Sequence, residues 1–147
     1  MISDPDDDRV IVASHVHGAM TDVRGRYVIS GADFELVTDG SVRSGGRGEA
    51  ASSLDLLVAS LVSCALNAFR YDLVPPGRPE RSVEIFARVE RDLTADSLGT
   101  LILECFFDDV DSITAEDLVD QYKRRCRIYA AVKDSLPIVF IPHVTRA

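Results

Sequence analysis

Alternating apolar and polar positions predict several strands. Residues 82–91 are the clearest case, because Val83, Ile85 and Val89 fall on one face while Glu84 and Arg88 fall on the other. Similar patterns predict strands at residues 10–16, 26–37, 100–107 and 138–141, with 26–37 folded as a hairpin around Gly31 and Ala32. Between them, the glycines of residues 41–48 predict a loop.

Two stretches have helical patterns. Residues 54–71 contain no glycine or proline and are apolar on nearly every side, which indicates a helix buried at the centre of the protein. Ser52 and Asp55 have the spacing of a capping box at its start, and the proline-rich residues 75–79 end it. Thr114 and Asp117 predict a second capping box, opening a helix that runs to residue 134. This order of elements indicates an α+β fold with antiparallel pairing.

Composition narrows the function classes. A chain of 147 residues with 46% hydrophobic and 27% charged residues is typical of one globular domain. The net charge of −8 disfavours nucleic acid and anionic membranes as partners. Part of this charge lies in residues 1–8, which we expect to form a flexible acidic tail. An acidic N-terminus without an apolar run is unlike a signal peptide, so we expect a cytoplasmic protein.

The three cysteines carry the candidate chemistry. Cys64 lies in the middle of the first helix, so no helix N-terminus can activate its thiol and a cation from elsewhere must do so. Cys126 lies in the basic run 123–127, which either favours its thiolate or forms a solvated helix face. An isolated cysteine in an apolar helix is usually inert packing, and this alternative is open for Cys64. Cys105 lies in an apolar strand and is expected in the core.

Other motifs are weak. His15, His17 and His143 have no set spacing to a fourth ligand, so no metal site is predicted. The glycine-rich residues 44–48 lack the lysine and hydroxyl residue of a phosphate-binding loop. We expect no cofactor.

The chain resembles the OsmC/Ohr family over nearly its whole length, as a divergent OsmC-like member. The family signature is similar to residues 49–64. In this stretch a loop of small residues leads into an apolar helix, and Cys64 is the last residue of the motif. Cys126 follows Cys64 by 62 residues, about the separation found in the family. As in the family, this second cysteine is followed by a proline, here Pro137, just before the last strand. The resemblance implies one OsmC-like domain over residues 1–147, with antiparallel sheets wrapped around a long buried central helix, in an intertwined homodimer.

The resemblance also implies an activity. Family members of this type are thiol peroxidases, in which the first cysteine, here Cys64, reduces an organic hydroperoxide and the second, Cys126, resolves the sulfenic acid as a disulfide. An external dithiol, a lipoyl group in some members, then reduces the disulfide. A strand arginine holds the thiolate, which Arg24 or Arg26 would supply here.

This sequence departs from the family pattern in three places, the first being the absence of the family's loop proline before the central helix. The carboxylate of the Ohr branch aligns with Leu54, whereas the acidic residue of the general OsmC-like branch aligns with Asp55, which also fits a purely structural capping role. The usual proline after the second cysteine is replaced by Arg127. The alternative function is a non-catalytic module that binds a small hydrophobic ligand in the same pocket.

Overall fold

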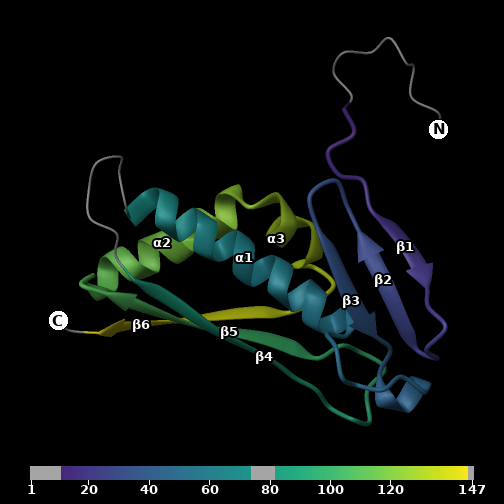
Figure 1. Ribbon diagram of the computed structural model, residues 1–147. Coiled ribbons are helices and arrows are strands. Elements are labelled where there is room, and N and C mark those ends of the chain that lie inside the picture. The colour runs from purple at the N-terminus through teal and green to yellow at the C-terminus, as the bar shows by residue number, and fades with distance from the viewer. Residues whose placement is uncertain (1–10, 74–81, 146–147) are drawn as a thin grey trace. The chain divides into compact units, whose positions relative to one another are not determined.

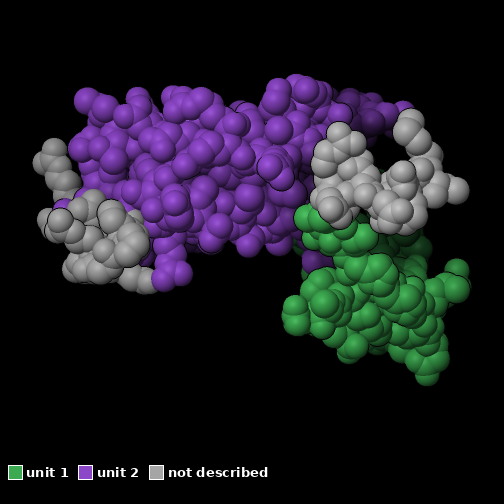
Figure 2. All heavy atoms as spheres, turned by 90° about the horizontal axis from the view of Figure 1, so that it is seen from above, with its two compact units in different colours: residues 1–55 green, residues 56–147 purple. Residues whose placement is uncertain are grey.

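The computed structural model describes residues 11–73 and 82–145. The chain divides into two compact units, Met1–Asp55 and Leu56–Ala147 (Figure 2). The acidic tail of residues 1–8 and the proline-rich residues 75–79 lie outside the described residues. That residues 1–147 form one domain stays a prediction.

The first unit contains a three-stranded antiparallel sheet in the order β1-β2-β3 (Figure 1). Its strands are β1 (His17–Met20), β2 (Arg26–Ser30) and β3 (Glu35–Asp39). Pairing of Ser30 with Glu35 confirms the predicted hairpin. The predicted strand at residues 10–16 is wrong where it can be compared, because residues 11–16 are exposed and not in a strand. Strand β1 starts only at His17 because its partner β2 ends at the opposite residue, Ser30.

The predicted loop at residues 41–48 follows β3 and contains one short 3-10 helix, η1 (Val42–Ser44). Its packing requires glycine at one point, because a Cβ atom on Gly46 would lie 1.8 Å from the carbonyl oxygen of Gly40. The loop leads into α1 (Ser53–Leu73), whose bounds agree closely with the predicted central helix.

The second unit is built on a three-stranded sheet in the order β4-β5-β6, with the helices on one face (Figure 1). Its other elements are β4 (Val83–Glu90), β5 (Thr100–Asp108), α2 (Ser112–Arg125), α3 (Arg127–Val132) and β6 (Ile138–Thr145). The three strands confirm the predicted ones, but β6 runs parallel to β5 instead of antiparallel. Parallel neighbours need a long crossover, which α2 and α3 supply here.

The core of this unit lies between the sheet and the helices. Strand β5 alternates regularly, with every second side chain from Leu101 to Phe107 buried. The buried apolar residues are Leu61, Ala65, Phe69, Leu101, Leu103, Cys105, Phe107, Ala115, Leu118, Val119, Tyr122, Cys126 and Leu136.

Helix α1 buries only one stripe within the chain. Leu61, Ala65 and Phe69 are fully buried, whereas Ser63 and Asn67 are exposed. The expectation of a helix buried on all sides is therefore not met within a single chain. The exposed side carries the polar residues Ser60, Ser63 and Asn67 at helical spacing, so the sequence marks the open side although no charged residue lies between Asp55 and Arg70.

Helix α2 begins two residues earlier than predicted. Its N-cap is Asp111, whose carboxylate accepts hydrogen bonds from the backbone N–H of Thr114 at 2.8 Å and from its hydroxyl at 2.9 Å. The predicted capping box at Thr114 and Asp117 is therefore wrong, because Thr114 serves as the partner of the cap and not as the cap itself.

Candidate functional site

The structure brings the two helical cysteines together. The Sγ atoms of Cys64 and Cys126 lie 2.9 Å apart and share a hydrogen bond, although 62 residues separate them in the sequence. Cys64 lies on α1 beside the buried stripe and is half-buried, while Cys126 is 8% exposed. A small residue, Ala68, follows Cys64 by one helical turn and leaves room for this approach.

The chain at Cys126 is not helical, which corrects the predicted continuous helix from 114 to 134. Cys126 has φ −77° and ψ 115°, so α2 ends before it and α3 begins after it. Its sulfur accepts a hydrogen bond from the backbone N–H of Tyr129 at 3.3 Å, as an N-cap side chain does. The break therefore turns the sulfur into a hydrogen-bond acceptor for the following helical turn.

The two thiols line a pocket with a volume of about 270 Å³. All of its lining residues belong to the second unit: Cys64, Asn67, Ala68, Tyr71, Tyr122, Arg125 and Cys126. The pocket is therefore a shallow depression, largely open to solvent, with two sulfur atoms in its lining.

The environment affects the acidity of the two thiols in opposite directions. Burial, with a contribution from the hydrogen bond to Cys126, raises the pKa of Cys64. Burial also opposes ionisation of Cys126, but hydrogen bonds from Cys64 and from the backbone of Tyr129 outweigh it and lower its pKa. The two thiols titrate as a pair, in which loss of a first proton is favoured and loss of the second is disfavoured.

The basic run around Cys126 places less positive charge next to the thiol pocket than the sequence suggested. Lys123 lies over the ring of Phe140, 5.4 Å from its centroid, and Arg124 and Arg127 are exposed. Arg125 is the one basic residue of the run that lines the thiol pocket, and it forms an ion pair with Asp72. The sequence shows that Arg125 is next to Cys126 near the end of a helix. It does not show that Asp72 is the ion-pair partner of Arg125.

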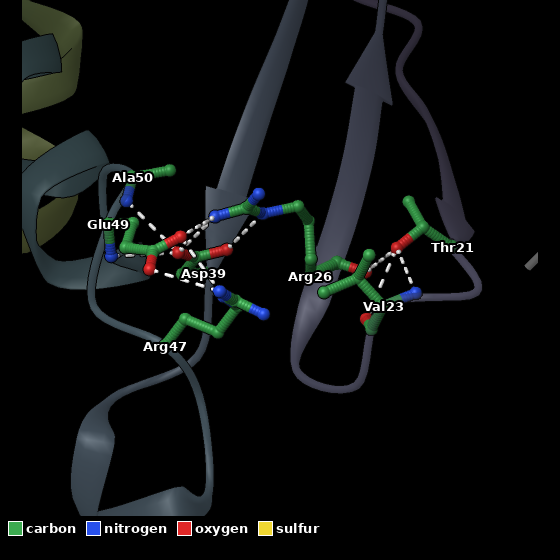
Figure 3. A network of polar contacts seen from close by, with 7 residues as sticks. All are labelled: Thr21, Val23, Arg26, Asp39, Arg47, Glu49 and Ala50. Carbon is green, nitrogen blue, oxygen red and sulfur yellow. Dashed lines mark hydrogen bonds and ion pairs between the residues drawn. The ribbon is translucent and has the colours of Figure 1, made fainter.

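The strand arginine Arg26 has two acidic partners in its own unit (Figure 3). Its guanidinium binds Asp39 through two hydrogen bonds of 2.9 and 3.0 Å, and it reaches Glu49 at 3.0 Å. Arg47 also binds Glu49, at 3.0 Å, which makes the cluster a four-residue network.

Asp39 is the centre of this network. Its Oδ2 also accepts hydrogen bonds from the backbone N–H groups of Glu49 and Ala50, so it holds the loop that precedes α1 (Figure 3). The hydrogen bonds from Arg26 lower the pKa of Asp39 to about 2. Arg26 is thus matched in charge within the first unit, and Arg24 lies in the exposed turn before it. That either arginine supports the Cys64 thiolate stays a prediction.

Asp55 makes the contacts of a helix cap. Its carboxylate accepts hydrogen bonds from the backbone N–H and the hydroxyl of Ser52, both at 2.8 Å, and its own N–H binds the Ser52 hydroxyl at 3.2 Å. This reciprocal pair confirms the predicted capping box. It also gives a structural role to the carboxylate that aligns with the acidic residue of the general OsmC-like branch.

The remaining candidates lie outside this pocket. Cys105 is fully buried in β5, and burial raises its pKa to about 12. His143 stacks on Phe106 and lies 3.2 Å from Glu104. Among the described residues, no three metal-binding side chains form a cluster.

Comparison with known proteins identifies the family. Residues 46–140 match the family model described as OsmC-like protein. This match spans more than half of the chain, and the chain therefore belongs to the OsmC-like family. Membership supports a role in redox chemistry or peroxide resistance. No curated protein is significantly similar to the chain in sequence.

Solved structures share the fold at low identity. A hypothetical protein from Aquifex aeolicus VF5 is 16% identical with a TM-score of 0.74, covering 93% of this chain and 99% of its own. An OsmC like protein from Mycoplasma pneumoniae is 12% identical with a TM-score of 0.66, covering 94% and 99%. The organic hydroperoxide resistance protein OhrB of Bacillus subtilis is 17% identical with a TM-score of 0.57, covering 91% and 98%.

Helix α1 is long and apolar enough to span a membrane by length and composition alone. The core helix of a soluble protein meets the same criterion, so this property is weak support for insertion.

Proposed function

We propose that the protein is a thiol peroxidase that reduces organic hydroperoxides in the cytoplasm. The observation that carries the proposal is the 2.9 Å separation of the Cys64 and Cys126 sulfurs at the wall of an open pocket. Two thiols this close can form a disulfide with little movement of the helices that carry them. Membership of the OsmC-like family makes a redox use of such a pair the natural assignment.

In the first step, Cys64 passes its proton to the Cys126 thiolate across their hydrogen bond, and the resulting Cys64 thiolate attacks the terminal oxygen of the hydroperoxide. The oxygen–oxygen bond breaks, a sulfur–oxygen bond forms, and the sulfur is oxidised to a sulfenic acid while the peroxide is reduced. The departing alkoxide takes a proton from the thiol of Cys126, which adjoins it. This proton transfer releases an alcohol and leaves Cys126 as a thiolate.

In the second step, the Cys126 thiolate attacks the sulfenic sulfur of Cys64. A sulfur–sulfur bond forms, the sulfur–oxygen bond of the sulfenic acid breaks, and the departing hydroxide takes up a proton from the bulk solvent and leaves as water. The hydrogen bonds that lower the pKa of Cys126 favour the thiolate that this step needs. An external dithiol, a lipoyl group being one chemical type, then reduces the disulfide by thiol exchange and restores both cysteines.

The proposed assembly is a homodimer. Along α1 the buried side chains recur once per turn, and Ser63 and Asn67 lie on the open side. Tyr71, an aromatic residue on the same helix, is 78% exposed. A second copy of the chain would cover the apolar residues of α1 that a single chain leaves partly in contact with water, among them Leu56, Val62 and Leu66.

The test is peptide mapping and thiol counting after treatment of the reduced protein with an organic hydroperoxide. Cys64→Ser should abolish the reaction, because no nucleophile remains. Cys126→Ser should consume about one equivalent of peroxide and stop as a sulfenic acid that oxidises further. Cys105→Ala is the matched control and should still form the Cys64–Cys126 disulfide. A disulfide that includes Cys105, or no intrachain disulfide, would rule out the mechanism.

One observation favours the alternative, a binding module for small hydrophobic molecules. Burial raises the pKa of the Cys64 thiol, as expected for a cysteine that only packs. A binding module would leave Cys64 unreactive toward an alkylating reagent near neutral pH. A peroxidase would react, because one proton of the thiol pair is readily lost.

A further inference from the structure

Tyr122 is a buried side chain in contact with the thiol pocket. It lies on α2, one helical turn before Cys126, and its ring is held by aromatic neighbours. Ring centroids lie 6.0 Å away for Phe69, 5.8 Å for Tyr129 and 5.4 Å for Phe140. These contacts fix the ring in one place, so the direction of its hydroxyl group is also fixed.

The hydroxyl group of Tyr122 has no hydrogen-bond partner among the described residues, although its oxygen is fully buried. Burying a hydroxyl without a partner is unfavourable, and phenylalanine would fill the same space without that cost. Tyr122 lines the same pocket as Cys64 and Cys126. The buried hydroxyl therefore lacks an acceptor as long as both thiols of the pocket are neutral.

We propose that the Tyr122 hydroxyl donates a hydrogen bond to the Cys126 sulfur when that sulfur is negatively charged. Tyr122 is then a positioning residue for the resolving thiolate, and this catalytic consequence rests on the proposed peroxidase function. A thiolate accepts hydrogen bonds much more strongly than a neutral thiol, so the donor gains its partner only on ionisation.

The acidity of the two groups supports this direction of donation. Burial, followed by the interaction with Cys126, raises the pKa of the Tyr122 phenol well above its usual range, so the hydroxyl keeps its proton. The hydroxyl in turn contributes to the lowered pKa of Cys126. No bond to the phenol proton breaks during turnover, and the hydrogen bond weakens when the Cys126 sulfur loses its charge in the disulfide.

The effect of the Tyr122 hydrogen bond on Cys126 can be sized from typical hydrogen-bond energies. A hydrogen bond to a charged group corresponds to a shift of about one pH unit in the midpoint of ionisation. About tenfold more thiolate would then be present below that midpoint, while the lower basicity of the sulfur reduces its nucleophilicity by about threefold. The net gain in the rate of disulfide formation is about threefold.

The test uses Tyr122→Phe, with Tyr129→Phe as the matched control from the same aromatic cluster. Both are made in the Cys64→Ser background, where Cys126 titrates without a second reactive thiol. Thiolate absorbance and the rate of alkylation are followed as a function of pH. Cys105 does not interfere, because burial raises its pKa to about 12.

Tyr122→Phe should raise the midpoint of Cys126 ionisation by about one pH unit, and Tyr129→Phe should leave it unchanged. An unchanged midpoint in Tyr122→Phe, or equal shifts in both variants, would overturn the inference. The measurement needs no peroxide, so it can succeed or fail independently of the proposed peroxidase activity. In the chain with both cysteines, Tyr122→Phe should slow disulfide formation by about threefold after the sulfenic acid forms.

Discussion

Oxidation of the thiol pair should stabilise the folded protein substantially. A Cys64–Cys126 disulfide closes a loop of roughly 60 residues, and the entropy that such a loop removes from the unfolded chain corresponds to about 4 kcal/mol at 25 °C. Little of this gain should be lost to distortion, because the two sulfurs already lie 2.9 Å apart in the reduced protein. The oxidised protein should therefore be more stable than the reduced protein by up to about 4 kcal/mol.

Urea unfolding followed by circular dichroism measures this difference. With a slope of about 2 kcal/mol per molar urea, the midpoint of the oxidised protein should lie up to about 2 M above that of the reduced protein. Oxidation is carried out with an organic hydroperoxide and reduction with a dithiol. Thiol counting under denaturing conditions shows that the sample is fully in one state.

Cys64→Ser is the control, because it does not react with the hydroperoxide, and its midpoint should be the same under oxidising and reducing conditions. An oxidised wild-type protein that unfolds at the same urea concentration as the reduced one, or earlier, would refute the reasoning. It would mean that bond formation pulls the two helices away from their native positions and offsets the loop term.

Three further predictions concern charge and assembly. The pKa of Asp39 is lowered to about 2 by Arg26, so the stabilisation it provides is present above the ordinary value of 3.8 and is lost as the pH falls toward 2. Asp39→Asn should therefore lower stability near neutral pH and converge with the wild type near pH 2 in acid unfolding. Arg125→Ala should slow alkylation of the thiol pair at neutral pH by about two- to fivefold, and Arg124→Ala should not; equal rates in both variants would exclude a role for Arg125. Light scattering at micromolar concentration should give the mass of a dimer, and a monomeric mass would exclude the proposed assembly.

The strands and the central helix could be predicted from local patterns. In β4 and β5 the alternation is regular because one face packs on the core, so each side chain reports its own burial. The reciprocal contacts of Ser52 and Asp55 are equally local and were readable from their spacing. The pairing of Arg26 with Asp39 could also have been derived, because a hairpin that pairs Ser30 with Glu35 places these two residues opposite each other.

The features that were missed depend on tertiary contacts. The chain breaks its helix at Cys126 without a glycine or proline to mark the place, and there the sulfur lies 2.9 Å from that of Cys64 on another helix. Tyr122 has the spacing of a core residue, and its pattern describes the ring but not the unpartnered hydroxyl. The direction of β6 relative to β5 depends on how α2 and α3 cross the sheet, which the apolar pattern of β6 does not encode.

The helix break at Cys126 also affects which amino-acid substitutions the chain tolerates at position 127. Arg127 is the first residue of α3, a position where proline is well accepted because its fixed φ suits the first turn and the missing N–H has no helical partner. Cys126 has φ −77° and ψ 115°, close to the extended conformation that a following proline imposes. Arginine and proline can therefore replace each other at position 127 without rebuilding the backbone. The proline usual in the family and the Arg127 of this chain are both compatible with the same backbone conformation at the start of α3.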